Sequence, residues 1–563
     1  MAWTFKQLPY TRPDAETLKA SYQKATEALC GATAYQDARA AYMAQEALLK
    51  EFSTLQTLVS IRNTMDTNDA FYDAENRFFN EQMAQFMPFQ KEADEALLAS
   101  AFRGDFEAEF GKQLFAIMET RLKTQDKAIV PDLIAESELC ETYKKTAASC
   151  QVEFMGETCN FYGLLKHMES PDRSVRRAAF VQWAKLYEGI ADTLDDLYTE
   201  LIAVRLKMAE KLNLNNYTEL AYLNMGRQDY RAEDVAMFRK QVREVVVPAV
   251  DRYRRAQAAR IGVDKLRYYD EAYMFPDGNA DPIGSEAEMI QKAQAMYREL
   301  SPETGEFFDF MVEHDLFDLT TRPGKHLGGY CTALLEKDAP FIFSNFNGTA
   351  ADVGVLTHEA GHAFAFYRAG REQLLTDYLS STSEVCEIHS MTMEHFTYPW
   401  ISLFYGQENV AKAKFAHLVE ALSSLPYLVS VDEYQHRIFE NPGMSPAERR
   451  ALWHDIEKTY MPWRDYDGVP FLEQGGFWMQ KQHVFLYPFY YIDYALAQVS
   501  AFELYGRMNT DKEAAWADYL RLCQLGGSQG YFDLLRQANL SNPFAPGSVE
   551  KAVAHVIKEL DAM

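Results

Sequence analysis

Paired cysteines are absent from this sequence. Its seven cysteines are scattered through 563 residues, and no two of them form a Cys-x-x-Cys pair. Disulfide-stapled domains carry even numbers of closely spaced cysteines, and thiolate zinc modules carry cysteine pairs. The sequence therefore supports neither class, and we expect the protein to work in a reducing compartment.

A surplus of basic residues is also absent. Lys and Arg number 56 against 82 Asp and Glu, which gives 56 − 82 = −26. Nucleic-acid binding needs clustered Lys and Arg, so no nucleic-acid partner is expected. The acidic surplus chiefly indicates a well-solvated surface, and attraction of cationic substrates is the less favoured interpretation.

Long apolar runs are missing as well. The most apolar stretch, 483–502, is interrupted by Asp493 and Gln498, which argues against a membrane span. The first ten residues, MAWTFKQLPY, lack the basic start and apolar stretch of a secretory signal. We expect no membrane partner and a cytoplasmic location.

Helical periodicity fills most of the chain. Ser170, Pro171 and Asp172 supply, in order, a capping hydroxyl, a first-turn proline and a first-turn acid. The apolar residues that then recur every three or four positions are Phe180, Trp183, Tyr187, Ile190, Leu194, Leu197 and Leu201. Another helix begins with a capping box at Ser445. The pattern predicts a mainly α-helical fold.

Strand signals are concentrated in one region. Residues 328–335 and 339–346 are rich in Tyr, Thr, Phe and Ile, with a turn between them, which indicates a β-hairpin. We place a domain boundary near residue 200. The expected parts are an N-terminal helical lobe, 1–200, and a region that carries the chemistry, 201–563.

The motif with the clearest chemistry is His-Glu-Ala-Gly-His at residues 358–362. His358 and His362 share one face of a predicted helix that residues 349–352 cap and that runs to about Arg368. Two imidazoles at this spacing can bind one zinc ion. Glu359 is displaced around the axis, where it can take a proton from an attacking water. Gly361 leaves room for another backbone or side chain to approach closely.

A catalytic zinc ion needs a third protein ligand and one open position. In a metzincin the ligand helix continues to a later Gly and His, but those positions hold Ala365 and Arg368 here. A glutamate on the following helix, 380–396, is the alternative. The candidates His389 and His395 on that helix are less favoured, because they lie off the stripe that its glutamates form.

The following helix offers three glutamates near one stripe: Glu384, Glu387 and Glu394. Their spacing alone does not choose among them. Carboxylates next to a metal commonly orient the ligating imidazoles. We therefore expect one glutamate to ligate while its neighbours hold histidines.

These motifs resemble the thimet oligopeptidase and oligoendopeptidase F family of metallopeptidases, most closely its bacterial branch with oligoendopeptidase F and Pz-peptidase. The first likeness is T-H-E-A-G-H at 357–362, and the second is Glu387-Ile-His-Ser with Glu394, similar to the family's E-x-P-S-x-x-x-E. A histidine, His389, stands where many members have proline. The resemblance implies that Glu387 is the third ligand of one Zn²⁺ ion per chain, with Glu384 and Glu394 as supporting carboxylates.

The third likeness is HVFLYPFYYIDY at 483–494. The resemblance implies that His483 and Tyr494 bind or polarise the scissile carbonyl, and that Tyr487 and Tyr491 contact the substrate. The fourth likeness is Gly-Gly-Ser at 526–528.

The resemblance also implies a fold of two helical lobes around a deep active-site channel, with a small β-sheet next to the zinc-binding helix. The predicted hairpin, which starts at Gly328 and Gly329, fits that sheet. An edge strand there would pair with an extended peptide substrate. A deep channel would restrict substrates to short peptides.

The function predicted is a zinc endopeptidase that hydrolyses internal bonds of short oligopeptides. The first alternative is a helical metallocarboxypeptidase, which would need a cationic group for the substrate carboxylate. The second is a non-catalytic peptide-binding protein, which is disfavoured because all the motif residues are present. A purely structural zinc is disfavoured because such sites are closed and cysteine-rich.

Overall fold

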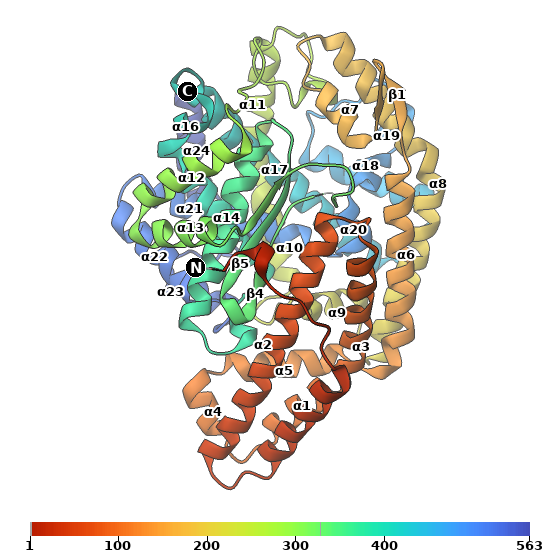
Figure 1. The fold of residues 1–563 in the computed structure, drawn as a ribbon. Coiled ribbons are helices and arrows are strands. Elements are labelled where there is room, and N and C mark those ends of the chain that lie inside the picture. Colours follow the sequence, from red (N-terminus) through yellow and green to blue (C-terminus); the bar gives the residue numbers. More distant parts are fainter. Residues whose placement is uncertain (1–2, 327) are drawn as a thin grey trace. The chain divides into compact units, whose positions relative to one another are not determined.

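Contacts within the chain group its residues into two units in the computed structural model, which describes residues 3–326 and 328–563 (Figure 1). The first unit consists of 1–125, 281–408 and 507–540, and the second of 126–280, 409–506 and 541–563. The division into 1–200 and 201–563 stays a prediction about domain organisation. Residue 200 itself lies inside a long helix.

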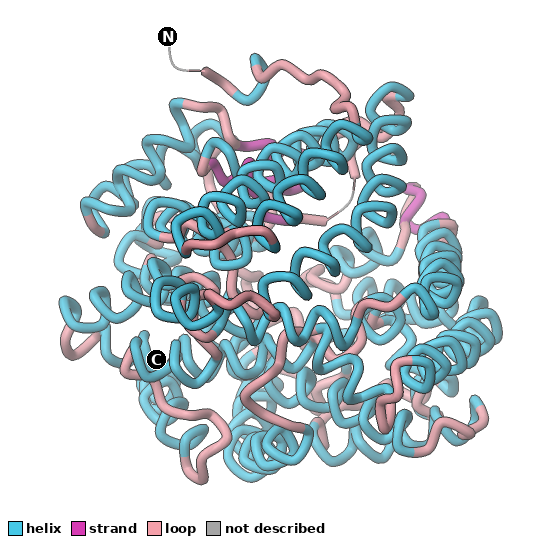
Figure 2. The backbone as a smooth tube through the Cα atoms, turned by 90° about the horizontal axis from the view of Figure 1, so that it is seen from below, coloured by secondary structure: helices cyan, strands magenta, loops and turns pink. Residues whose placement is uncertain are grey.

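Helices dominate both units (Figure 2), which confirms the mainly α fold. The first unit contains α1 (Ala15–Cys30), α2 (Tyr35–Met65), α3 (Ala70–Leu98), α4 (Arg103–Phe110), α5 (Gln113–Thr124), α12 (Glu286–Leu300), α13 (Pro302–Glu313), β3 (Phe317–Thr320), β4 (Tyr330–Leu334), β5 (Ala339–Phe346), α14 (Ala351–Glu372), α15 (Ser383–Phe396), α16 (Ser402–Tyr405), α22 (Lys512–Leu525) and α23 (Tyr531–Gln537).

The second unit contains α6 (Val130–Ala148), β1 (Val152–Phe154), β2 (Glu157–Cys159), α7 (Phe161–His167), α8 (Arg173–Lys211), α9 (Tyr217–Asn224), α10 (Ala232–Gln241), α11 (Val247–Arg260), α17 (Val410–Glu440), α18 (Pro446–Tyr460), α19 (Pro470–Glu473), α20 (Gln482–Leu486), α21 (Tyr491–Met508) and α24 (Ser548–Ala562). None of the described helices is both long and apolar enough to cross a bilayer.

The long helix α8 confirms the predicted apolar stripe, and six of its seven residues are buried. Its start differs from the prediction. Asp172, rather than Ser170, is the N-cap, because its carboxylate accepts from the backbone N–H of Ser174. The capping box at Ser445 is present at the start of α18.

The sheet of the first unit has the strand order β3-β5-β4. β4 and β5 form the predicted antiparallel hairpin, with Tyr330 opposite Phe343. β3 pairs parallel to β5 and has only four residues, too few to be predicted from an alternating pattern. β5 is central and almost entirely buried, and α14 packs against it (Figure 1). β4 is consequently an edge strand beside the helix that carries the His-Glu-x-x-His motif.

Asp493, which interrupts the most apolar stretch of the sequence, lies on α21 and is fully buried. The guanidinium of Arg227, whose side chain is also fully buried, donates to Asp493 at 2.6 Å and to the carbonyl of Phe489 at 2.6 Å. A buried charge of either sign is strongly destabilising without its counter-charge. The ion pair therefore links α21 to the turn after α9 inside the second unit.

We predict that Asp493→Asn lowers the free energy of unfolding by about 3–5 kcal/mol, since Arg227 keeps its charge and loses its counter-ion. Urea unfolding measures the change. The matched control is Asp561→Asn, which removes the half-exposed partner of Arg252 at 3.0 Å and should cost less than about 1 kcal/mol. Equal, small effects of both substitutions would contradict this role for the pair.

Candidate metal centre

The motif helix α14 begins at Ala351 and runs to Glu372, one turn beyond the predicted end. Its start also differs from the prediction, because no side chain caps its N-cap residue Ala350. Instead, the carboxylate of Asp352 turns back and accepts from the backbone N–H groups of Asn347 and Gly348, at 3.1 and 2.7 Å. These bonds tie the end of β5 to the first turn of α14.

Gly361 lies at a close approach of α14 and α15. A Cβ on this residue would stand 2.6 Å from Cα of Ser390 and 2.7 Å from the carbonyl oxygen of His389. Both distances are well below van der Waals contact, and both neighbours are backbone atoms that cannot swing away. The close approach predicted for this glycine is therefore made by the backbone of α15.

The crossing brings together His358, His362 and Glu387. Oε2 of Glu387 lies 3.2 Å from Nε2 of His358 and 3.5 Å from Nε2 of His362, and the three donor atoms lie within 4.8 Å of one another. The imidazoles are about one-fifth exposed, whereas the Glu387 side chain is buried. Two imidazole nitrogens and one carboxylate oxygen, with both imidazoles partly exposed, match the donor set of catalytic zinc.

Neighbouring groups hold these donors in place. Nδ1 of His358 lies 2.6 Å from Oε1 of Glu394, so a proton on Nδ1 leaves Nε2 free to bind a metal. The hydroxyl of Ser390 donates to Oε2 of Glu387 at 3.0 Å. Ser390 was not among the predicted site residues, although its place three residues after Glu387 put it on the same stripe.

The electrostatics of the group favour positive charge. Burial by itself lowers the pKa of His358, but hydrogen bonds to Glu387 and Glu394 outweigh it and raise the pKa well above its ordinary value. Burial works in the opposite direction on Glu387, yet the two imidazoles hold the pKa of that carboxyl well below its usual range. Glu359 is buried next to them, and burial raises its pKa.

The remaining candidates on α15 have other environments. Glu384 is fully buried in the first turn of the helix. His389 is buried too, and burial lowers the pKa of its imidazole to about 3. His395 has its Nδ1 3.0 Å from the hydroxyl of Tyr398. None of these three belongs to the donor group.

Gly328 and Gly329 lie directly before the edge strand β4. Gly328 adopts a φ of 94°, in the region that favours glycine, and its carbonyl accepts from the side-chain amide of Asn345 at 2.7 Å. A Cβ on Gly329 would lie 3.6 Å from the side chain of Val355 on α14. The structure thus places the start of β4 beside the motif helix.

The predicted substrate residues around His483 belong to the second unit, where they form one cluster. The His483 ring centroid lies 5.9 Å from that of Tyr487, 4.8 Å from Tyr491 and 6.3 Å from Tyr494. Tyr490, which was not predicted, joins this cluster 5.2 Å from Tyr494. The donor group belongs to the first unit, whereas this cluster belongs to the second.

The Gly-Gly-Ser segment packs against the residues that directly precede α15. A Cβ on Gly526 would lie 2.1 Å from the carbonyl oxygen of Tyr378, and one on Gly527 would lie 2.2 Å from that of Ser380. The backbone N–H of Gly527 donates to the carbonyl of Tyr378 at 3.0 Å. The two glycines therefore allow close backbone packing against the segment that precedes α15, the helix that carries Glu387.

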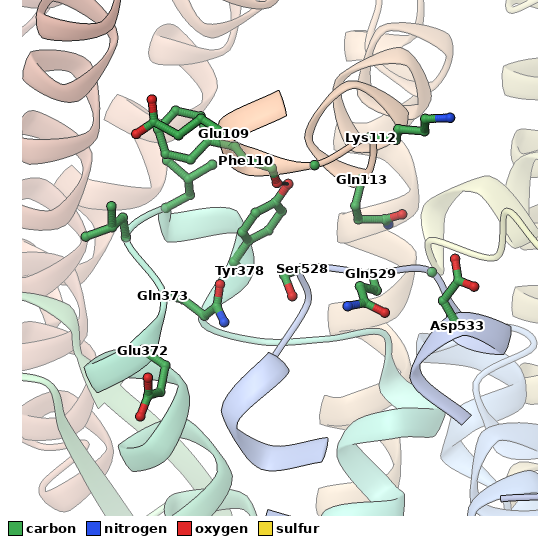
Figure 3. A pocket seen from close by; sticks show the side chains of 14 residues that line it. Glu109, Phe110, Lys112, Gln113, Glu372, Gln373, Tyr378, Ser528, Gln529 and Asp533 are labelled. Atoms are coloured by element: carbon green, nitrogen blue, oxygen red, sulfur yellow. Dashed lines mark hydrogen bonds between the residues drawn. The ribbon is translucent and has the colours of Figure 1, made fainter. Parts of the chain in front are cut away.

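A cavity of about 540 Å³ lies elsewhere in the first unit (Figure 3). Its lining comes from three segments, 109–113, 372–378 and 528–533, and contains no histidine or cysteine. The Tyr378 hydroxyl donates to the carbonyl of Phe110 at 2.7 Å and so ties two of these segments together. The cavity shares no residue with the donor group.

Comparison with known proteins gives a family match over most of the chain. A model described as peptidase family M3 matches residues 166–552, and one described as the peptidase M3 N-terminal domain matches residues 5–125. Chromosomal oligoendopeptidase F of Lactococcus lactis subsp. cremoris is 22% identical over 399 residues. That alignment covers 68% of this chain and 62% of the relative, so it spans less than two thirds of the relative's length.

Solved structures extend the likeness over the whole chain. PZ peptidase A with an inhibitor is 45% identical, has a TM-score of 0.94, and is matched over 100% of this chain and 99% of its own. A candidate oligoendopeptidase F from Bacillus anthracis str. Ames is 42% identical, with a TM-score of 0.90 and the same coverage.

The geometry predicts that Gly361→Ala lowers zinc affinity at least about tenfold, because the new methyl group pushes α15 and its Glu387 away from the imidazoles. Zinc titration of the metal-free protein measures the change. Gly354→Ala on the same helix is the matched control, since a Cβ there meets nothing within 4 Å. The control should bind zinc normally and gain about 1 kcal/mol of stability. Normal zinc binding by Gly361→Ala would show that the crossing can relax.

Proposed function

Because the chain belongs to peptidase family M3, we propose that it is a zinc-dependent endopeptidase that hydrolyses internal bonds of short oligopeptides. The observation that carries the proposal is the donor group at the crossing of α14 and α15. His358, His362 and Glu387 converge there, and both imidazoles are partly exposed. The family match and the relatives described above support the same reaction class.

The donor set fits one zinc ion per chain, because imidazole and carboxylate ligands with an open position are typical of catalytic zinc. When bound, zinc would act as a Lewis acid on the peptide carbonyl and lower the pKa of a water at its open position. The chain's own contribution is to fix the ligands. Glu394 orients His358, and Ser390 holds the oxygen of Glu387 that faces both imidazoles.

Glu359 is the proposed general base. It lies on α14 between the two histidines and is buried, and burial raises its pKa. A carboxylate with a raised pKa is a stronger base than an exposed one. In the proposed cycle Glu359 takes the proton from the attacking water and then delivers it to the leaving amine.

The cluster in the second unit would act on the substrate. We assign Tyr494 and His483 as donors to the developing oxyanion, and Tyr487 and Tyr491 as contacts for substrate side chains. Tyr487 is the most exposed of the four, at 53%. In the first unit, β4 would pair with the extended peptide, with Gly328 and Gly329 leaving its backbone approachable.

The alternative function is removal of C-terminal residues. A carboxypeptidase needs a cation for the terminal carboxylate, and the ammonium of Lys481 lies 4.7 Å from the ring centroid of Tyr491. A short peptide blocked at its C-terminus separates the two functions, because only an endopeptidase cuts it. Survival of the blocked peptide together with trimming of an unblocked one would establish the alternative.

We predict that Glu359→Gln keeps its zinc but loses at least about 100-fold in turnover of a blocked, internally quenched peptide. The amide preserves the shape of the side chain and removes the base. Turnover and zinc content are measured on the same preparation. Glu372→Gln, at the last residue of α14, is the control and should cleave normally. Near-normal cleavage by Glu359→Gln would exclude it as the base.

Tyr494→Phe is expected to lower kcat about 100-fold, with little change in KM or zinc content, because its hydroxyl is assigned to the transition state alone. Steady-state kinetics and metal analysis separate these quantities. Tyr505→Phe on the same helix is the control, since its hydroxyl donates to Glu559 at 2.7 Å, and it should leave kcat unchanged. Parallel loss of zinc and turnover in Tyr494→Phe would mean that this tyrosine is structural.

A further inference from the structure

A second group of potential metal ligands lies in the second unit, on the β1–β2 hairpin and helix α7. It consists of Glu157, Cys159 and His167, whose carboxylate oxygen, thiol sulfur and ring nitrogen lie within 4.8 Å of one another. Nε2 of His167 and Oε2 of Glu157 are 4.0 Å apart. Among residues 3–326 and 328–563, this is the one such group besides the donor group at α14 and α15.

We propose that Glu157, Cys159 and His167 form a second metal site that binds a borderline-soft divalent cation, zinc above all. A thiolate together with an imidazole selects zinc and its neighbours in the transition series. Calcium and magnesium prefer sets made only of oxygen. The site shares neither a residue nor a unit with the donor group at α14 and α15, so it does not depend on that group.

The hairpin places the first two donors on one side. Met155 and Gly156 both have positive φ, 52° and 87°, which is the backbone of the tight turn that joins twisted strands. The register pairs Phe154 with Glu157 at the turn. Glu157 and Cys159 are two residues apart on β2, and residues at that spacing point to the same face of a strand.

Helix α7 carries the third donor, His167, and packs closely against Cys159 because one of its residues is a glycine, Gly163. Asn160 caps the helix by accepting from the backbone N–H of Gly163 at 3.0 Å. A Cβ on Gly163 would lie 3.2 Å from Cβ and 3.3 Å from Sγ of Cys159, so the thiol rests directly on this part of the helix. His167 follows Gly163 by four residues and therefore lies on the same face.

Charged and aromatic neighbours of the three donors favour a cation. The carboxylates of Glu157 and Glu153 interact electrostatically with the sulfur of Cys159, and two carboxylates next to one site attract a cation. A metal ion in contact with a thiol displaces its proton outright. The ring of Phe154 packs edge-on against His167 at 5.0 Å and holds the imidazole.

The donors need only a small contraction to close on an ion. Zinc–sulfur and zinc–nitrogen bonds of about 2.3 and 2.0 Å place tetrahedral ligands roughly 3.5 Å apart. The side chain of Glu157 is 75% exposed and can move inward at little cost. Solvent on its open side supplies the remaining ligand. A bound ion would clamp the hairpin to α7.

Cobalt(II) tests the site directly in the full chain. Thiolate ligation to Co²⁺ produces a near-ultraviolet sulfur-to-cobalt charge-transfer band, which the histidine and glutamate donors at α14 and α15 cannot give. Titration of the metal-free, reduced protein should therefore show this band. The reconstituted protein should hold two zinc ions per chain, one for each donor group.

Variants assign the band to the proposed residues. Cys159→Ser should abolish it and remove one zinc ion per chain, and His167→Gln should weaken the site at least about tenfold. Cys150→Ser, which removes another buried thiol near the same hairpin, should retain the band. His362→Ala should also retain it while losing the other zinc ion, so failure of the two sites can be told apart.

Any of three outcomes would overturn the proposal. The first two are absence of the charge-transfer band and its survival in Cys159→Ser, because either result means that the thiolate of this group does not ligate the ion. The third is an unchanged zinc affinity in His167→Gln, whose altered side chain is close to the surface and is expected to leave folding intact. Zinc-dependent slowing of amide exchange in β1 and β2 is the independent readout for the clamp, and equal exchange with and without zinc would refute it.

Discussion

The close crossing of α14 and α15 at Gly361 is the constraint on which the candidate metal centre depends. A single helix suffices to bring the two histidines of the motif onto one face, as it does for any residues four apart. Glu387 comes from another helix. Its carboxylate reaches both imidazoles because the backbone at Ser390 occupies the space where a side chain on residue 361 would be. Gly526 and Gly527 likewise let the backbone of the segment before α15 pack closely against them. The position of Glu387 therefore depends on glycines at two places: Gly361 on α14, and Gly526 with Gly527.

Charge then determines what this crossing can hold. Burial disfavours isolated charge of either sign, yet Glu387 and Glu394 keep the pKa of His358 well above its ordinary value, and the imidazoles keep that of Glu387 well below. Both directions show that positive charge between these groups is stabilised. A divalent cation meets the same field with twice the charge of a proton. The carboxyl of Glu359 is buried next to the two imidazoles, and this burial raises its pKa in the metal-free protein.

Features that rest on local spacing could be predicted from the sequence: the helical content, the β4–β5 hairpin and the paired histidines. The short strands of β1, β2 and β3 could not, because three or four residues are too few to show an alternating pattern. The start of α8 was placed two residues early, because Ser170 and Asp172 are both good caps and only the backbone decides between them. Spacing also left the three glutamates of α15 equivalent. The crossing separates them, since Glu387 joins the donor group and Glu394 meets Nδ1 of His358.

The second donor group shows what a search for motifs overlooks. Cys159 does not belong to a Cys-x-x-Cys pair. Its candidate partners are a glutamate two residues earlier and a histidine eight residues later. The turn at Gly156 and the missing side chain of Gly163 bring them together, and neither is a metal-binding signal by itself. The two groups also differ in chemistry: one offers two nitrogens and an oxygen, the other a nitrogen, an oxygen and a sulfur. A thiolate donates more charge to a metal ion than an imidazole or carboxylate does, and so weakens its Lewis acidity. The group that contains sulfur is therefore better suited to a structural metal ion, and the group without sulfur is better suited to a catalytic one.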